Sequence, residues 1–224
     1  CTDEVAEHTV AAALTLLRKL PALDASVRAG DWAAVSQAKP LKPFSDTVFG
    51  FFGLGQIGRA VLSRIGAFGF RILAADPGLS EEEAARLGVT PVEAERLFAE
   101  ADIVSLHAPA LPETVGFVNA ARLATMQPHA AVVNAARGQL VVEADIADAL
   151  RRGIIGAAAL DVFETEPLPA DSPLRDAPNL LLTPHAAWYS EAAIGRLQGL
   201  VAEDIARALR GAPPRKPVPD MPGG

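Results

Sequence analysis

Three ionisable side chains, Arg137, Glu166 and His185, each follow a predicted strand by a few residues. Ligands of open parallel sheets bind beyond the carboxyl ends of the strands, so neighbouring strands can bring these residues together. A neutral histidine can remove the proton of an alcohol near neutral pH as hydride leaves. A carboxylate beside the ring orients it and favours its protonated form, and an arginine can grip a substrate carboxylate with two hydrogen bonds. This set suits hydride transfer to or from a small 2-hydroxy acid.

Each of the three residues has an ordinary structural explanation when it stands alone. A single histidine is usually structural, an Arg-Gly pair usually lies on the surface, and a Glu-Pro pair often only ends a strand. Spacing alone does not decide between the two explanations, so the decision depends on the motifs and elements around them.

A glycine-rich turn at residues 53–58 reads Gly-Leu-Gly-Gln-Ile-Gly and matches the pattern G-x-G-x-x-G. It follows an apolar strand and opens a predicted helix, which is the context that gives this weak pattern its meaning. Gly53 allows the tight turn, Gly55 lets the backbone approach a pyrophosphate, and Gly58 lets helix and strand pack closely. A glycine turn without a ligand is the alternative, but the strand, the glycines and the helix together favour a dinucleotide.

An acidic residue ends the second predicted strand. Asp76 lies 18 residues after Gly58, and its carboxylate can accept hydrogen bonds from both hydroxyls of a ribose. The same charge would repel a 2′-phosphate, and no arginine occurs within the next several residues to neutralise one. The sequence therefore predicts NAD rather than NADP.

Strands and helices alternate from residue 47 onward. This order implies a parallel sheet covered on both faces, so we predict an α/β fold with a doubly wound parallel sheet of the Rossmann type. The predicted strands occupy residues 48–52, 71–75, 103–106, 130–134, 155–160 and 180–183. The predicted helices occupy residues 2–20, a short stretch ending at Gly30, the stretch from the glycine turn to about residue 68, and residues 80–87, 91–99, 143–152 and 189–209.

The predicted organisation has three parts. Residues 1–20 form a hinge or dimer helix, capped by Thr2, whose middle is so apolar that it must be covered on more than one side. Residues 21–184 form the NAD-binding domain, and residues 185–224 form a closing helix and an extended proline-rich tail that return toward a substrate domain. Because the chain begins at Cys1 and enters a helix almost at once, we interpret it as starting in the middle of a larger protein.

Composition excludes several classes of protein. Half of the 224 residues are hydrophobic, which is enough for a sizeable core, and the formal net charge of −7 argues against general nucleic-acid binding. The single cysteine excludes a disulfide within the chain and a cysteine-built zinc site, and we predict no metal. No apolar run approaches a membrane span and no secretion signal is visible, so the cytoplasm is the default location.

Four ordered motifs resemble the signatures of the D-2-hydroxyacid dehydrogenase family. They are the glycine turn, Asn-Ala-Ala-Arg-Gly at residues 134–138, Leu-Asp-Val-Phe-Glu-Thr-Glu-Pro at residues 160–167, and Thr-Pro-His at residues 183–185. The match covers nearly the whole chain, and the ordered set is far more specific than any single motif. The resemblance implies an oxidoreductase that passes hydride between NAD and a 2-keto or D-2-hydroxy acid.

The resemblance also implies roles for individual residues. Arg137 would bind the substrate, His185 would be the acid/base, and Glu166 rather than Glu164 would be its partner. Asp161 would lie near the nicotinamide amide, whereas His107 would be a structural residue at a strand end near the cofactor. The expected cofactor contacts are Gly53, Gly55, Gln56, Ile57, Gly58, Asp76, His107, Pro109 and Asp161.

Within the family, residues 176–180 and 185–190 look closest to the C-terminal binding protein branch. Trp188 matches a residue that lines the substrate pocket there, or it only anchors the last helix. His129 stands where glycine is common before a strand, and His8 is expected to be a packing or surface residue.

Family members carry roughly a hundred further residues at the front, which form most of the substrate domain. We therefore expect the chain as given to be incomplete, with the first and last helices as remnants of the hinge, and to bind NAD without turnover. A homodimer is also expected, since the resemblance places the first helix at a subunit interface. The alternatives are an NAD-sensing interaction protein and a cofactor-binding fragment without activity. Formate dehydrogenases are disfavoured because they have glutamine where Glu166 stands.

Overall fold

The computed structural model describes residues 1–215 and contains one parallel sheet of seven strands in the order β3-β2-β1-β4-β5-β6-β7. The order reverses between β1 and β4, which is the topological switch of a doubly wound sheet, and the predicted fold class is therefore confirmed. The strands are β1 (Val48–Phe52), β2 (Arg71–Ala75), β3 (Thr90–Pro91), β4 (Ile103–Leu106), β5 (Ala131–Asn134), β6 (Ala157–Leu160) and β7 (Leu180–Leu182).

Six of the seven strands were predicted, three of them with the bounds that the structure has. The missed strand, β3, is a two-residue edge strand that pairs with Leu73 and Ala74 of β2. Proline lacks an N–H and is tolerated at such an edge. Because Pro91 pairs with β2 and the Val92 N–H donates to the Ala74 carbonyl, the helix expected at residues 91–99 begins later, at Ala94.

Nine helices are described within residues 1–215. They are α1 (Thr2–Leu17), α2 (Leu20–Arg28), α3 (Ala34–Ala38), α4 (Gln56–Ile65), α5 (Glu81–Leu87), α6 (Ala94–Glu100), α7 (Ala120–Leu123), α8 (Glu143–Arg151) and α9 (Glu191–Leu209). The short helices α3 and α7 were not predicted. None of the nine is long and apolar enough to cross a membrane.

The first helix is shorter than predicted. It ends at Leu17, and the chain turns at Lys19, whose φ of 52° lies in the left-handed region. A new helix, α2, starts at Leu20 with Pro21 in its first turn, where a proline fits because its missing N–H would have no partner there. The N-cap is Cys1, without a side-chain hydrogen bond, so the expected Thr2 cap is wrong.

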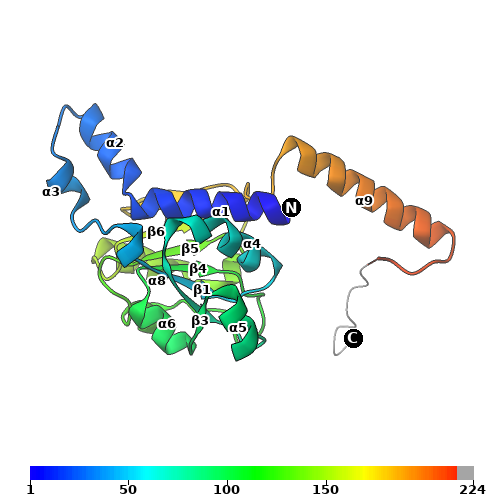
Figure 1. Cartoon of the computed structure of the whole chain (residues 1–224). Coiled ribbons are helices and arrows are strands. Elements are labelled where there is room, and N and C mark those ends of the chain that lie inside the picture. Colours follow the sequence, from blue (N-terminus) through cyan, green and yellow to red (C-terminus); the bar gives the residue numbers. More distant parts are fainter. Residues whose placement is uncertain (216–224) are drawn as a thin grey trace.

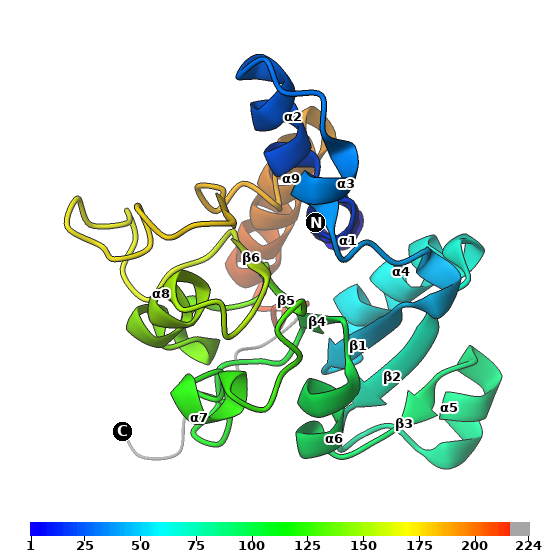
Figure 2. The ribbon, with the colours of Figure 1, turned by 90° about the vertical axis from the view of Figure 1, so that its left-hand side faces the viewer.

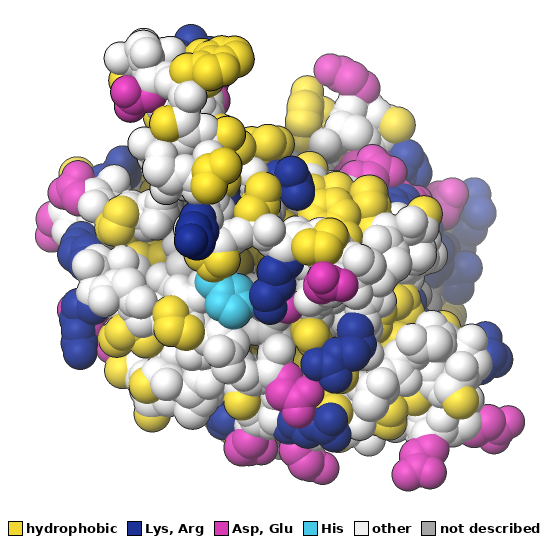
Figure 3. All heavy atoms as spheres, turned by 60° about the vertical axis from the view of Figure 1, so that its left-hand side comes forward, with side chains coloured by type: hydrophobic (Ala, Val, Ile, Leu, Met, Phe, Trp, Pro, Cys, Tyr) yellow, Lys and Arg dark blue, Asp and Glu magenta, His cyan; other side chains and the backbone are white. Residues whose placement is uncertain are grey.

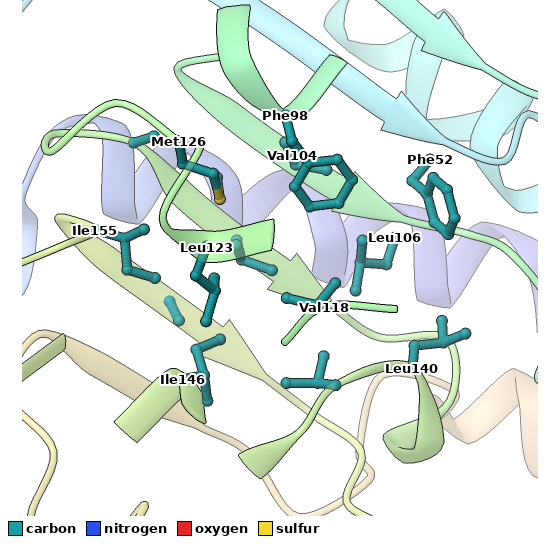
Figure 4. Packing of buried hydrophobic residues seen from close by; sticks show 14 of the residues in the cluster. Phe52, Phe98, Val104, Leu106, Val118, Leu123, Met126, Leu140, Ile146 and Ile155 are labelled. Carbon is teal, nitrogen blue, oxygen red and sulfur yellow. The ribbon is translucent and has the colours of Figure 1, made fainter. Parts of the chain in front are cut away.

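Two hydrophobic clusters lie on the two faces of the sheet, because successive strand residues point to opposite sides. Phe49 and Phe51 of β1 belong to the cluster under α1 and α4, whereas Val48 and Phe52 belong to the cluster under α6, α7 and α8. Figure 2 shows these helices on the two sides of the sheet, and Figure 4 shows Phe52 near Phe98 in the second cluster. The sheet is therefore packed on both faces, and the residues at its strand ends lie at the edge of a buried core.

Helix α1 lies along the sheet and packs against α4, β5 and β6, which buries one side of the helix, including Ala6, Ala13 and Leu16 (Figure 1). Val10, Leu14 and Leu17 are only partly buried, so cover on more than one side stays a prediction. Helices α2 and α9 instead project from the body. The exposed apolar side chains include Trp32, 91% exposed, beside α2, and Leu209, 84% exposed, on α9. Figure 3 shows hydrophobic side chains, in yellow, on the part that projects at the top of the molecule. The hinge role and the limits of the three predicted parts stay predictions, and residues 216–224 of the expected tail lie outside the described residues.

Candidate active site

The glycine turn joins β1 to α4 at the switch point of the sheet. Gly53 has a φ of 87°, and a Cβ there would lie 2.8 Å from the backbone N of Ala108. A Cβ at Gly58 would lie 3.1 Å from the carbonyl oxygen of Gly53. Both positions therefore need glycine for packing within the chain.

Gly55 is different, because a Cβ added there would meet no atom within 4 Å. It is the N-cap of α4, so the unpaired N–H groups of the first helical turn, including those of Gln56 and Ile57, point to the same space. Open room beside free N–H groups and a positive helix end is what a pyrophosphate requires. The turn therefore fits a dinucleotide.

Asp76 follows β2 and faces this turn. Its Oδ2 accepts a hydrogen bond from the Leu54 N–H at 2.5 Å, and its Oδ1 accepts one from the Gly78 N–H at 2.7 Å. The carboxylate is thus held at the strand end. The nearby Arg59 donates to Glu83 at 2.6 Å, an ion pair between two helices that the sequence did not reveal.

His107 and Pro109 follow β4 and border the glycine turn. The His107 Nε2 lies 2.9 Å from the Ser105 hydroxyl, and the ring stacks on Phe51 at a centroid distance of 5.8 Å. Burial lowers the pKa of His107 to about 4, so the ring is neutral at neutral pH. The Pro109 carbonyl accepts a hydrogen bond from the Thr114 hydroxyl at 2.6 Å. The geometry of this segment suits a wall of the cofactor site.

Arg137 is exposed on the turn that follows β5, and a buried residue that the sequence analysis missed shapes this turn. The Asn134 side chain donates to the Arg137 carbonyl at 2.8 Å and accepts from the Ala136 N–H at 3.0 Å. A Cβ on the next residue, Gly138, would overlap the backbone of Phe163. The arginine turn therefore packs directly on the segment that leads to Glu166.

His185 and Glu166 form a hydrogen-bonded pair at the ends of β7 and β6. The ring Nδ1 lies 2.7 Å from the Glu166 Oε2, and the other oxygen accepts from the Phe163 N–H at 2.9 Å. Burial alone would raise the pKa of Glu166, but the hydrogen bonds from His185 and Phe163 and the histidine charge lower it below its ordinary value. The His185 Nε2 has no hydrogen-bond partner within residues 1–215, so it is the ring atom that can meet a substrate.

Comparison with known proteins decides the family. Residues 10–187 match the family model described as "D-isomer specific 2-hydroxyacid dehydrogenase, NAD binding domain". The chain belongs to this family. It is 43% identical over 206 residues to a D-3-phosphoglycerate dehydrogenase of Mycobacterium tuberculosis, covering 92% of this chain and 38% of the relative. It is 39% identical over 222 residues to a D-3-phosphoglycerate dehydrogenase of Synechocystis, covering 99% of this chain and 39% of the relative. The chain thus spans about two fifths of the length of these relatives.

A solved structure agrees with this assignment. The D-lactate dehydrogenase of Lactobacillus jensenii, crystallised with NAD+, superposes with a TM-score of 0.85 at 28% identity, covering 97% of this chain and 69% of that one. The chain is therefore an NAD-binding domain of the D-2-hydroxyacid dehydrogenase family, and NAD is its cofactor. The finer resemblance to the C-terminal binding protein branch stays a prediction.

In this family member, Asp161 is fully engaged within the chain. Its Oδ1 accepts hydrogen bonds from the Thr183 hydroxyl at 2.6 Å and the Ala186 N–H at 2.8 Å, and its Oδ2 accepts from the Ala187 N–H at 2.9 Å. The carboxylate therefore holds the loop that carries His185. A contact with the nicotinamide amide, expected from the resemblance, stays a prediction.

Two other residues, Trp188 and His8, lie in or beside the loop that carries His185. Trp188 is half-buried and meets Tyr189 edge-to-face at 5.8 Å, and its place in a substrate pocket stays a prediction. His8, expected to be a packing or surface residue, lies with its Nε2 3.2 Å from the Thr183 hydroxyl. No sequence signal connects His8 with Thr183, because 175 positions separate them.

A cavity of about 680 Å³ lies away from this site, at the edge where the strands begin. It is lined by the C-terminal end of α1, by the connector before β1, and by His129 and Asp102. Arg137, Glu166 and His185 lie at the opposite edge of the sheet, so the volume of a cavity does not locate the candidate site in this protein.

Proposed function

We propose that the protein is an NAD-dependent D-2-hydroxyacid dehydrogenase and that this chain contributes its acid/base pair and its substrate-binding arginine. One observation carries the proposal: the His185–Glu166 pair, 2.7 Å apart, lies at the strand ends beside the arginine turn. These strand ends belong to the same sheet edge as the glycine turn that fits NAD, so the acid/base and the cofactor turn share one edge.

When bound, the nicotinamide cofactor would supply the hydride acceptor for an alcohol carbon or the hydride donor for a carbonyl carbon. During oxidation, His185 takes the hydroxyl proton on Nε2, and during reduction it gives a proton back to the oxygen. Glu166 accepts from Nδ1 and thereby fixes which nitrogen faces the substrate and stabilises the charged ring. Arg137 binds the substrate carboxylate with its guanidinium, for which two parallel hydrogen bonds are the favoured geometry.

We also propose that Asp76 makes the site selective for NAD. A carboxylate held by the Leu54 and Gly78 N–H groups cannot easily turn away from the ribose. Calorimetric titration with NADH and NADPH tests this selectivity, and comparable affinity for the two would contradict it.

The proposed substrate is a 2-keto or 2-hydroxy acid. D-3-phosphoglycerate is the first candidate, because a relative named D-3-phosphoglycerate dehydrogenase is 43% identical over 206 residues. The test measures NADH oxidation by the protein at its natural full length with glyoxylate, hydroxypyruvate and a methylthio-keto acid, and NAD reduction with D-3-phosphoglycerate. NAD binding without turnover on any of these would refute the enzyme and favour an NAD-sensing interaction protein. Turnover abolished by Arg137→Ala and by His185→Ala would support the assigned roles.

A homodimer is the proposed assembly. Several apolar side chains of the α2–α3 segment are exposed, among them Trp32 and Val35, and contiguous apolar surface is typical of protein–protein contacts. Light scattering on the full-length protein checks this, and a monomer at working concentrations would count against it.

A further inference from the structure

Two residues of α1 hold the two ends of the loop that carries His185, here named the histidine loop and comprising residues 183–190 between β7 and α9. At its start, the His8 Nε2 lies 3.2 Å from the Thr183 hydroxyl. At its end, the Ser190 hydroxyl donates to the Glu4 Oε1 at 2.8 Å. Residues four apart share one face of a helix, so one face of α1 supports the loop at both ends.

The direction of the His8 hydrogen bond follows from counting protons. A threonine hydroxyl has one proton, and Thr183 gives it to the Asp161 Oδ1 at 2.6 Å, because the ionised carboxylate can only accept. The Thr183 oxygen is therefore an acceptor toward His8, and the His8 Nε2 must carry a hydrogen. The His8 ring lies 3.8 Å from the Asp161 carboxylate, too far for a direct hydrogen bond, so the link runs through the threonine.

From Asp161 the chain of contacts reaches His185 itself. The Asp161 carbonyl accepts from the His185 N–H at 2.8 Å, while its carboxylate accepts from the Ala186 N–H at 2.8 Å. His185 has a φ of 52°, in the left-handed region that a residue with a side chain adopts only when its surroundings hold it. The ring that must face the substrate is thus presented by a strained backbone that these hydrogen bonds maintain.

The second anchor is ionic. Glu4 also accepts from the Arg196 guanidinium, at the start of α9. Hydrogen bonding to the backbone, to Ser190 and to Arg196 lowers the pKa of Glu4 to about 2, so its charge persists across the working range of pH. The end of the histidine loop is therefore fixed to the same helix that His8 uses to fix its beginning.

We propose that His8 is a positioning residue for His185, acting through the Thr183 hydroxyl and Asp161, with Glu4 as the second anchor of the histidine loop. The inference rests on the proposed dehydrogenase function. His8 does not touch the reacting atoms; it supplies the hydrogen-bond donor that fixes the Thr183 hydroxyl on Asp161 and so keeps the catalytic ring in its strained, productive orientation.

The test compares His8→Ala with His8→Gln in the full-length protein, because the glutamine amide can donate to Thr183 from a similar distance along the side chain. For His8→Ala, kcat falls about ten- to a hundredfold, since a displacement on the order of 1 Å at a reacting group costs about this much. The KM for NADH changes little. His8→Gln restores kcat to within about threefold of the wild-type value, the loss expected when one hydrogen bond becomes somewhat weaker.

A matched control lies one position away on the same helix. Glu7 is 66% exposed and faces Arg64 rather than the loop, so Glu7→Gln leaves kcat unchanged. Thr183→Val removes the acceptor while keeping the shape of the side chain, and it reproduces the loss of kcat even if His8→Ala fails to fold. Thr183→Ser keeps the hydroxyl and the activity.

A second measurement does not depend on turnover. The proton shared by the His185 Nδ1 and Glu166 gives an NMR signal that broadens or moves in His8→Ala and returns in His8→Gln. An unchanged kcat and an unchanged signal in folded His8→Ala overturn the proposal, as does a lowered melting temperature without either change. If the wild-type protein shows no turnover but the signal responds to His8, the dehydrogenase function fails while the positioning role stands.

Discussion

Two histidine–carboxylate pairs lie at opposite edges of the sheet. His185 meets Glu166 at 2.7 Å where the strands end, and His129 meets Asp102 at 2.5 Å where the strands begin. The residue types and distances are nearly alike. Their surroundings differ, and under the proposed function this difference separates a pair that exchanges a proton with substrate from a pair that holds the starts of strands together.

Asp102 divides its charge among several partners. Its Oδ1 also accepts from the Lys42 ammonium at 2.7 Å, its Oδ2 accepts from the Val48 N–H at 2.7 Å, and the side chain is 5% exposed. Burial alone would raise the pKa of Asp102, but the hydrogen bonds from Lys42, Val48 and His129 lower it. This carboxylate ties the connector to the starts of β1, β4 and β5.

Glu166 contacts no lysine or arginine among the described residues, so its charge is available to one imidazole. The His185 side chain is 51% exposed, compared with 27% for His129. A carboxylate whose charge faces one exposed imidazole can stabilise the protonated form of that ring. A carboxylate that also faces a lysine stabilises the protonated form of its histidine less. The proposed roles, catalytic for one pair and structural for the other, therefore follow from what else each carboxylate binds.

The largest expected difference between the two pairs is in turnover. In the full-length protein, His185→Ala lowers kcat by about a hundredfold or more, the usual scale of acid–base catalysis. His129→Ala, the matched change at the other edge, leaves kcat within about threefold because the ring is remote from the strand ends that carry the chemistry. Steady-state kinetics with saturating NADH measures both, and equal losses would remove the distinction.

Stability should show the reverse ranking. Asp102→Asn removes the charge opposite Lys42 and weakens the hydrogen bonds that this buried side chain accepts, which costs about 1–3 kcal/mol. Glu166→Gln costs less than about 1 kcal/mol, because its pair is largely exposed. Urea unfolding followed by circular dichroism gives both values. A larger loss for Glu166→Gln would mean that its pair is the structural one.

The sequence predicted the pair at the carboxyl edge and missed the one at the amino edge, for a physical reason. Strand ends could be placed because apolar runs stop at Gly53, Asp76 and His107, and the family motifs mark His185 and Glu166. The Lys42–Asp102–His129 cluster joins positions 60 and 27 residues apart that no motif and no periodicity connects. In the sequence, His129 stands out only because glycine is common at this position before a strand.

The same limit applies to helices and to the support of the site. The break of α1 before Lys19 is set by one left-handed residue and a proline, which the apolar pattern of residues 2–20 conceals. The contacts of Asn134 and His8 exist only in the folded chain. Sequence patterns therefore locate the residues proposed to touch ligands better than the residues proposed to position them.

The pH dependence of reduction gives a further, smaller contrast. Under the proposed mechanism, reduction needs the protonated form of His185, which the Glu166 charge favours. The Glu166 pKa lies below its ordinary value, partly through the same hydrogen bond, so the carboxylate stays ionised near neutral pH. Glu166→Gln removes this charge, and the pH at which the rate of reduction falls by half moves toward acid. His129→Gln leaves the profile unchanged. A shift toward alkaline pH would reverse the assigned electrostatics.

The smallest expected effect concerns a third carboxylate, Glu83. It tests whether a carboxylate shared between two partners has less effect on each of them. Glu83 accepts from Arg59 at 2.6 Å and from Arg86 at 3.3 Å, while Arg59 follows the last glycine of the turn. Glu83→Gln leaves the Arg59 guanidinium with a weaker partner near the ribose end of the proposed cofactor site, where a 2′-phosphate would attract it. The affinity for NADPH should rise about two- to fivefold, the range of a single exposed ion pair, while Asp76 keeps the affinity for NADH unchanged. Calorimetric titration of the wild type and of Glu83→Gln with both nucleotides measures this, with Glu82→Gln as the control. Equal NADPH affinity in all three proteins would show that Asp76 alone sets the selectivity.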